Sequence, residues 1–209
     1  MHARRTVVAV SVAAAFSAFA FAGIAQGQTL TVPQVSPNID SAYGRLEAAP
    51  LYQKLMADVR ADEARALAEL KTMTEIPAPP FKEKARAEYF VSRLKALGLS
   101  DAHIDAEGNA IGIRKGTGNG PRLLISAHLD TVFPEGTDVT VKSRDGKLYA
   151  PGIGDDTRGL AVLLSWLKVL NENKVQTVGD LVFVGNVGEE ELGNLRGMKA
   201  VFQIGRAHV

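Results

Sequence analysis

Two continuous apolar runs, separated by a strongly apolar helical stretch, set the fold class of this chain. The runs are Leu123-Leu124-Ile125 and Leu181-Val182-Phe183-Val184, and each is typical of a strand that is buried on both faces. Between them, leucines recur at helical spacing: Leu160, Leu163, Leu164, Leu167 and Leu170. A helix with such a broad apolar face packs against a sheet. The alternation of strand and helix therefore predicts an α/β fold, a mostly parallel sheet with flanking helices.

The residues that precede these runs predict two further helices and a hairpin. Residues 62–71 are rich in strong helix formers, and the run Pro77-Ala78-Pro79-Pro80 ends that helix. A second helix follows and ends at Gly98, a typical C-terminal cap. Strands are then expected over 103–106 and 110–114, on either side of a short turn.

The N-terminus has the pattern of a secretory signal peptide over residues 1–27. Arg4 and Arg5 precede an apolar stretch at 7–22, and small residues follow it. The apolar stretch is short and rich in alanine, which favours cleavage over retention as a membrane anchor. We therefore expect a periplasmic or secreted protein with no membrane attachment after cleavage.

The net charge gives no support for a nucleic-acid or membrane partner, and the absence of cysteine limits the possible metal ligands. The chain has 24 Lys+Arg and 23 Asp+Glu, and removal of residues 1–27 leaves 22 against 23, a net charge of −1. A chain so close to neutral gives no reason to expect a nucleic-acid or membrane surface. It contains no cysteine, so any metal ion must be held by histidine and carboxylate side chains.

Three segments place such side chains directly after an apolar run or beside glycine turns. They are Ser126-Ala127-His128-Leu129-Asp130-Thr131-Val132, Gly152-Ile153-Gly154-Asp155-Asp156-Thr157-Arg158-Gly159 and Gly188-Glu189-Glu190-Glu191. His128 follows the first strand, at the edge where α/β sheets place ligand sites. Asp130 returns to the same side two residues later, where a carboxylate can hold the imidazole N–H and orient the ring toward a metal.

The acidic pairs have both a structural and a chemical interpretation. Asp155 and Asp156 lie at the start of a helix, where one aspartate is favoured as a cap, yet two adjacent acids exceed that need. Glu189 and Glu190 follow the second strand, and a solvated charge run is their alternative. Two adjacent glutamates could instead divide the work, one binding metal and the other taking a proton from water.

In this order the three segments resemble the motifs of the di-zinc metallopeptidase family that includes aminoacylase, glutamate carboxypeptidase and peptidase T. The stretches 76–81 and 105–109 resemble the peptidase T-like branch. The likeness implies a zinc-dependent exopeptidase or amidohydrolase acting on small peptides or N-acyl-amino acids. It also implies the N-terminal part of the catalytic domain over residues 61–203, after a leader and helix at 28–60.

The resemblance implies a role for each acidic or histidine side chain of the motifs. His128 would bind one zinc ion, Asp155 would bridge two, and Glu190 would bind the second. Glu189 would be the general base, and Asp130 would orient His128. In this family the peptide bond that follows Asp155 is usually cis. Cobalt or manganese also suits such a carboxylate-rich site.

The family pattern extends beyond what this sequence contains. It includes a further acid shortly after residue 203, a distant histidine, and a lid domain through which a homodimer is expected. With the residues present, each ion has fewer than the three protein ligands typical of catalytic zinc, so we expect the chain alone to be inactive. Residues 204–209 match the translation of a common sequencing adapter, and we expect a non-native tail there.

Two alternatives stay open at this point. One is the other co-catalytic zinc aminopeptidase family, although Thr131-Val132 after the His-x-Asp argues against it. The other is an exported peptide-binding protein of the same fold that has lost catalysis. The presence of Glu189 argues against that interpretation, and the missing ligands leave it open.

Overall fold

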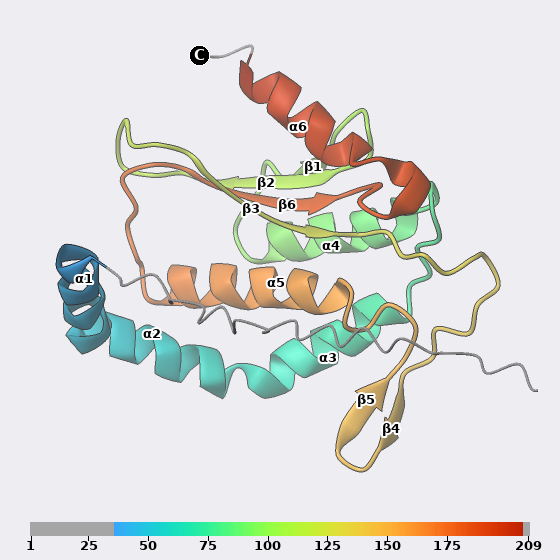
Figure 1. Ribbon diagram of the computed structural model, residues 1–209, viewed down its shortest axis with the longest axis horizontal. Coiled ribbons are helices and arrows are strands. Elements are labelled where there is room, and N and C mark those ends of the chain that lie inside the picture. Colours follow the sequence, from blue (N-terminus) through green and yellow to red (C-terminus); the bar gives the residue numbers. More distant parts are fainter. Residues whose placement is uncertain (1–35, 207–209) are drawn as a thin grey trace, which may run out of the picture.

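The computed structural model describes residues 36–206, so the predicted signal peptide at 1–27 lies outside the described residues. A four-stranded sheet forms one layer, with α4 and α5 packed along one face and α6 on the opposite side (Figure 1). Helices α2 and α3 form a further layer beneath α5. None of the helices in the described part of the chain is long and apolar enough to cross a membrane.

The sheet has the order β1-β2-β6-β3, and it mixes parallel and antiparallel strands. The strands are β1 (His103–Ile104), β2 (Ala110–Arg114), β3 (Leu123–His128) and β6 (Leu181–Asn186). Only β3 and β6 are parallel, whereas β2 is antiparallel to both of its neighbours. The α/β class is confirmed, but the expectation of a mostly parallel sheet is wrong. The physical reason is the tight hairpin between β1 and β2, which enforces antiparallel pairing, while the helical crossover through α5 permits parallel pairing.

The described residues form six α-helices. They are α1 (Pro37–Ala48), α2 (Pro50–Ala61), α3 (Glu63–Thr74), α4 (Lys84–Ala96), α5 (Thr157–Glu172) and α6 (Arg196–Arg206). Pro37 and Pro50 stand at the first helical position, where the missing N–H costs nothing. Two of these helices lie in the predicted leader-and-helix segment at 28–60. Residues 204–209 were predicted to be a non-native tail; the backbone of residues 204–206 continues α6, and residues 207–209 lie outside the described residues.

The core lies between the sheet and helices α4 and α5. Phe90 and Leu94 from α4, Leu160 and Leu164 from α5 and Phe183 from β6 are all fully buried. β3 differs from the expected doubly buried strand, because Leu123 is 56% exposed. Within residues 36–206, β3 stands at the edge of the sheet and pairs along one side.

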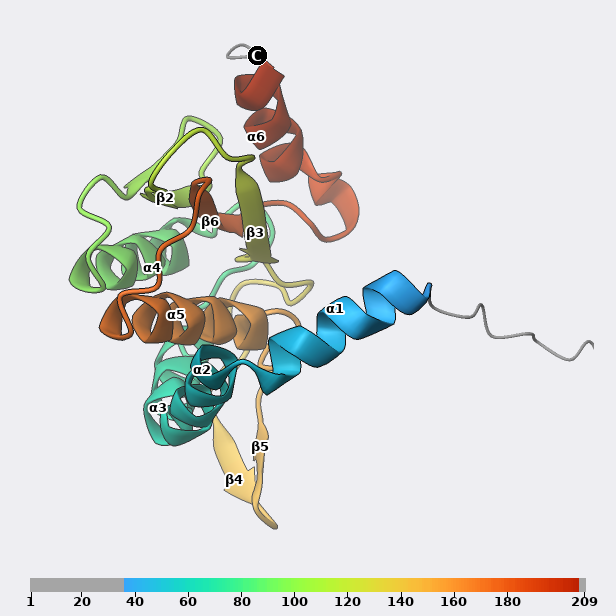
Figure 2. The same cartoon turned by 90° about the vertical axis from the view of Figure 1, so that its left-hand side faces the viewer.

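An apolar groove of about 300 Å³ runs beside this edge strand. Leu123 and Ile125 of β3, Trp166 of α5, and Leu55 and Met56 of α2 contribute to its walls. Figure 2 shows α2 and α5 below β3, with α1 extending away from the body of the molecule. The groove therefore combines the sheet edge and two helices in one apolar surface.

Two small elements complete the described chain. A two-stranded hairpin, β4 (Lys142–Arg144) and β5 (Lys147–Tyr149), projects from the body (Figures 1 and 2). A 3-10 turn, η1 (Glu191–Gly193), follows the loop after β6. The hairpin lies between the first and second motif segments, so the chain makes an excursion there before it returns to the sheet edge at α5.

A buried ionic cluster fixes α3 to α5. Asp62, at the junction of α2 and α3, is buried and accepts a hydrogen bond from the Ser165 hydroxyl at 2.7 Å. Arg65 Nη2 lies 2.5 Å from the same carboxylate, and Lys168 Nζ lies 3.5 Å from it. Burial alone would raise the pKa of Asp62, but the hydrogen bonds from Arg65 and Ser165 outweigh it, so the pKa is lowered.

Candidate metal centre

The parallel pair β3 and β6 brings two of the predicted segments to one edge of the sheet. In the register of these strands His128 lies opposite Asn186, so both strands end at the same level. The loop at 188–190 leaves β6 within two residues of that point. This is the carboxyl edge of the parallel strands, where α/β proteins place their ligand sites.

The third segment joins the other two at the N-terminus of α5. His128 Nε2 lies 2.8 Å from Asp155 Oδ1 and 4.0 Å from Glu189 Oε2. His128, Asp155 and Glu190 each offer one ligand atom, and these atoms all lie within 4.8 Å of one another. The structure thus brings together all four of the residues predicted to meet at this edge.

Asp155 and Asp156 have different positions although they are adjacent. Asp156 caps α5, since its Oδ1 accepts the Gly159 N–H at 3.0 Å, and its Oδ2 accepts the His128 N–H at 3.2 Å. The side chain of Asp155 is 82% exposed and faces the His128 ring. The peptide bond between the two aspartates is cis, as expected from the resemblance. Asp156 therefore accepts hydrogen bonds from backbone N–H groups, whereas the exposed Asp155 carboxylate is accessible to a ligand.

Asp130 is almost fully buried, and its carboxylate has partners other than those expected from the sequence. His128 Nδ1 lies 3.0 Å from the backbone oxygen of Asp130 and 3.7 Å from its carboxylate. The carboxylate oxygens instead accept the backbone N–H groups of Glu189 at 3.1 Å and Glu190 at 2.9 Å. The expected contact of imidazole with carboxylate is replaced by a carbonyl contact, which leaves Nε2 facing the site. Asp130 thus joins the histidine segment to the glutamate loop.

Asn109 is a fully buried supporting residue that the sequence analysis missed. Its Oδ1 accepts the Val187 N–H at 3.1 Å, directly before the glutamate loop. Its amide donates to Asp105 Oδ2 at 2.8 Å and to the Gly197 carbonyl at 3.0 Å. The Asp-x-x-Gly-Asn stretch at 105–109 was a signal for this position. Its role depends on contacts 78 and 88 residues away, which local patterns do not show.

The electrostatics of the site favour a cation. Burial raises the pKa of Glu190, and the charges of Asp155 and Glu189 add to that effect, while His128 opposes it. Burial acts to lower the pKa of His128, but the hydrogen bond to Asp155 and the charge of Asp130 outweigh it, so this pKa is raised. Carboxylates gathered at short range repel one another, and a bound cation relieves that repulsion. One imidazole nitrogen and several carboxylate oxygens form a donor set that fits zinc, cobalt or manganese.

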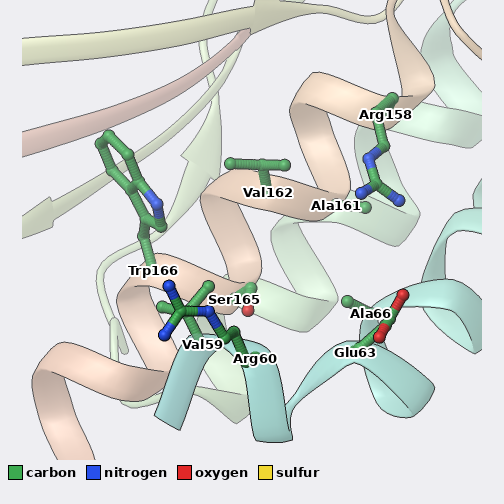
Figure 3. Close-up of a pocket in the computed structure, with 9 residues that line it drawn as sticks. All are labelled: Val59, Arg60, Glu63, Ala66, Arg158, Ala161, Val162, Ser165 and Trp166. Atoms are coloured by element: carbon green, nitrogen blue, oxygen red, sulfur yellow. The ribbon is translucent and has the colours of Figure 1, made fainter. Parts of the chain in front are cut away.

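A separate groove between α2, α3 and α5 lies apart from this cluster. Its volume is about 280 Å³, and Val162 and Trp166 of α5 and Arg60 of α2 line it, as Figure 3 shows. None of the clustered ligand residues is among its lining residues. We therefore place the candidate site at the carboxyl ends of β3 and β6, where the titratable groups converge.

The fold and this cluster define an α/β domain with a metal-type ligand set at the carboxyl ends of its two parallel strands. Residues 124–208 match the model of peptidase family M20/M25/M40. The M20 family is metal-dependent and acts on peptide or amide bonds.

Individual relatives agree with this match. Carboxypeptidase G2 from a Pseudomonas species is 34% identical over 114 residues, which cover 51% of this chain and 27% of that protein. A putative LysW-lysine/LysW-ornithine hydrolase from Thermococcus kodakarensis is 34% identical over 121 residues, 58% of this chain and 31% of that protein. The crystal structure of aminopeptidase PepT from Bacillus cereus superimposes with a TM-score of 0.56 at 25% identity, covering 66% of this chain and 39% of that one. The chain thus spans less than a third of the length of these two curated relatives.

Proposed function

We propose that this chain carries part of the catalytic centre of a zinc-dependent exopeptidase or amidohydrolase. The substrate class is a small peptide or an N-acyl-amino acid. The observation that carries the proposal is the convergence of His128, Asp155 and Glu190, whose ligand atoms lie within 4.8 Å of one another. Ligand atoms this close together can serve a pair of neighbouring ions with Asp155 common to both. The family match over residues 124–208 supports hydrolysis of a peptide or amide bond as the chemistry.

The exposure of each ligand residue suggests its place in the centre. The His128 side chain is 8% exposed, its Nδ1 contacts the Asp130 backbone oxygen, and its backbone N–H donates to Asp156 Oδ2, which suits a fixed ligand of one ion. The Asp155 side chain is 82% exposed, and it would be shared by the two ions. Glu190 would hold the second ion. When bound, a zinc pair would supply Lewis-acid activation of water and of the scissile carbonyl.

Glu189 is the general base in this proposal. Its side chain is 44% exposed, and its Oε2 lies 4.0 Å from His128 Nε2, so it borders the ligands and still reaches solvent. It would take a proton from the attacking water and transfer it to the leaving nitrogen. Asp130 holds the backbone of Glu189 and Glu190 and thereby sets the base and one ligand in place together.

The described residues supply fewer than three protein ligands to each of two ions. We therefore infer that the chain alone has little peptidase activity. A homodimer formed through a lid domain stays a prediction. So do export through residues 1–27 and a periplasmic or secreted location, which a reporter enzyme active only outside the cytoplasm, fused after residue 27, would test.

The test of the metal site is zinc binding by the 209-residue chain, measured by isothermal titration calorimetry. We expect His128→Ala to abolish binding, because it removes the nitrogen ligand. His103→Ala is the matched control, since His103 is exposed and contacts only a backbone oxygen among the hydrogen bonds of the described residues. Equal zinc binding by the wild type and by His128→Ala would contradict the proposal.

A further inference from the structure

Arg86, near the start of α4, is a buried cation whose hydrogen bonds go to backbone oxygens alone. Its exposure is 0%, and it is one of the largest fully buried side chains among residues 36–202. Nη2 lies 2.7 Å from the Ile76 oxygen, and Nη1 lies 2.9 Å from the Leu129 oxygen. Nη2 also approaches the Thr74 oxygen at 3.4 Å. Among the ion pairs of the described residues, none includes Arg86, so no carboxylate neutralises it directly.

Such a residue is costly to bury, because a guanidinium loses its hydration and gains no ion pair. Burial lowers the pKa of Arg86 to about 10, and the nearby charge of Asp130 opposes this effect. An apolar side chain would avoid the cost of burying a charge, but it would leave three buried carbonyl oxygens without a donor. The position therefore needs a side chain that can donate in several directions at once.

Two of the three oxygens have a structural explanation. Thr74 is the last residue of α3 and Ile76 follows shortly after it, so Arg86 satisfies carbonyls at a helix C-terminus. A cation is also favourable there because of the helix dipole. The Leu129 oxygen does not belong to this cap. It lies 43 residues further along the chain, between His128 and Asp130.

The Leu129 carbonyl belongs to the planar peptide unit that ends at Asp130. A hydrogen bond to its oxygen therefore fixes the orientation of the whole unit. The neighbouring Thr131 is held on the same side, because its N–H donates to the Ala78 oxygen at 3.0 Å. The segment from His128 to Thr131 is thus held at two points, by Arg86 of α4 and by Ala78 of the α3–α4 connection. The His128 ring and the glutamate loop both depend on Asp130, which lies between these points.

We infer that Arg86 is a positioning residue of the proposed metal centre. By holding the Leu129 carbonyl it fixes Asp130, and through Asp130 it fixes the His128 ring and the backbone of Glu189 and Glu190. This inference rests on the proposed function, because it assigns Arg86 to the same site. It goes beyond that function by placing one determinant of ligand geometry outside the three motif segments.

The test compares Arg86→Met with two control variants in the same helix. Arg93→Met removes an arginine that pairs with Glu69 and makes no recorded contact with the site. Leu94→Ala removes a fully buried side chain and controls for loss of stability. Zinc affinity is measured by calorimetry at a temperature where circular dichroism shows each variant folded, and the visible spectrum of bound cobalt reports ligand geometry.

We expect Arg86→Met to weaken zinc binding about 10-fold, the lower end of what loss of a supporting hydrogen bond costs, and to alter the cobalt spectrum. Both control variants should bind zinc as the wild type does. Arg86→Lys keeps the charge but cannot reach all three oxygens, so its zinc affinity should lie between that of the wild type and that of Arg86→Met. If Arg86→Met does not fold, the zinc affinity and cobalt spectrum of Arg86→Lys are compared with those of Leu94→Ala instead. Wild-type affinity and spectrum in the folded Arg86 variants would overturn the inference.

A measurement without metal separates this inference from the proposed function. Amide hydrogen exchange at Glu189 and Glu190 reports on the bonds to Asp130. In the metal-free protein, Arg86→Met should speed exchange at these two amides more than Leu94→Ala does. If the wild type binds no zinc, the proposed function fails, and faster exchange would still support the positioning role. Exchange no faster than in Leu94→Ala would contradict that role.

Discussion

Replacement of Asp130 by asparagine tests the junction between the histidine segment and the glutamate loop. The Asp130 carboxylate accepts two backbone N–H groups, at 3.1 and 2.9 Å, and its exposure is 1%. An asparagine amide has one accepting oxygen, so one of the two backbone N–H groups would face an NH₂ group instead. Loss of one hydrogen bond to a charged group costs about 2 kcal/mol of unfolding free energy.

Urea unfolding of the metal-free protein, followed by circular dichroism, measures this loss. With a slope of about 2 kcal/mol per molar urea, the midpoint of Asp130→Asn should fall by about 1 M. Zinc affinity should fall by about 10-fold or more, because the loop that carries Glu189 and Glu190 loses part of its support. Asp145→Asn is the matched control, since this carboxylate is 87% exposed and lies 3.9 Å from its nearest cation. A midpoint and an affinity equal to those of the control would refute the reasoning.

Three further outcomes follow from the same structure. In a longer protein that contains the whole family domain, Glu189→Gln should keep its zinc and lose most dipeptide turnover, whereas Glu190→Gln should lose zinc by metal analysis. Because the folded-state pKa of Asp62 is lowered, its stabilisation is present above the unfolded value of 3.8 and is lost as pH falls through the folded value. Asp62→Asn should therefore destabilise the protein at pH 7 and differ less from the wild type in acid, as urea titrations at several pH values would show. Gly197→Ala should lower the unfolding free energy by about 1–3 kcal/mol in thermal unfolding, because its Cβ would overlap Asn109 Oδ1 and the Val187 backbone. Wild-type behaviour in any of these measurements would count against the contact concerned.

The sequence was sufficient to predict which side chains meet at the carboxyl edge of the sheet. Apolar runs that end in His128 and shortly before Glu189 predict strands whose carboxyl ends carry ligands, and parallel pairing of β3 with β6 then brings those ends together. That prediction needed only local patterns and a rule about α/β sheets. The strand order needed more, because short apolar runs do not reveal which partner each strand takes. In the structure, β2 lies between β1 and β6, and the apolar run of β3 lies at the edge of the sheet.

The supporting residues were not predictable by the same reasoning. Arg86 lies in a stretch that reads as an ordinary charged helix, and its burial follows from where α4 meets the end of β3. Asn109 is likewise explained by contacts with segments far away in the sequence. For Asp130 the residue was predicted and its bonding atoms were not, since backbone and carboxylate oxygens compete for the same donors. Long-range packing decides all three positions.

One side of β3 pairs with no other strand of residues 36–206, and this has a practical consequence for anyone who handles the chain in solution. An edge strand with free N–H and C=O groups is a template for pairing with another chain, and natural proteins blunt such edges with charge. Here the strand begins with exposed Leu123 and borders the apolar groove that includes Trp166. Concentrated samples should therefore form strand-to-strand aggregates that bind thioflavin T. Leu123→Lys would place a charge on the edge, and it should keep the protein dispersed at the same concentration with no change in zinc binding.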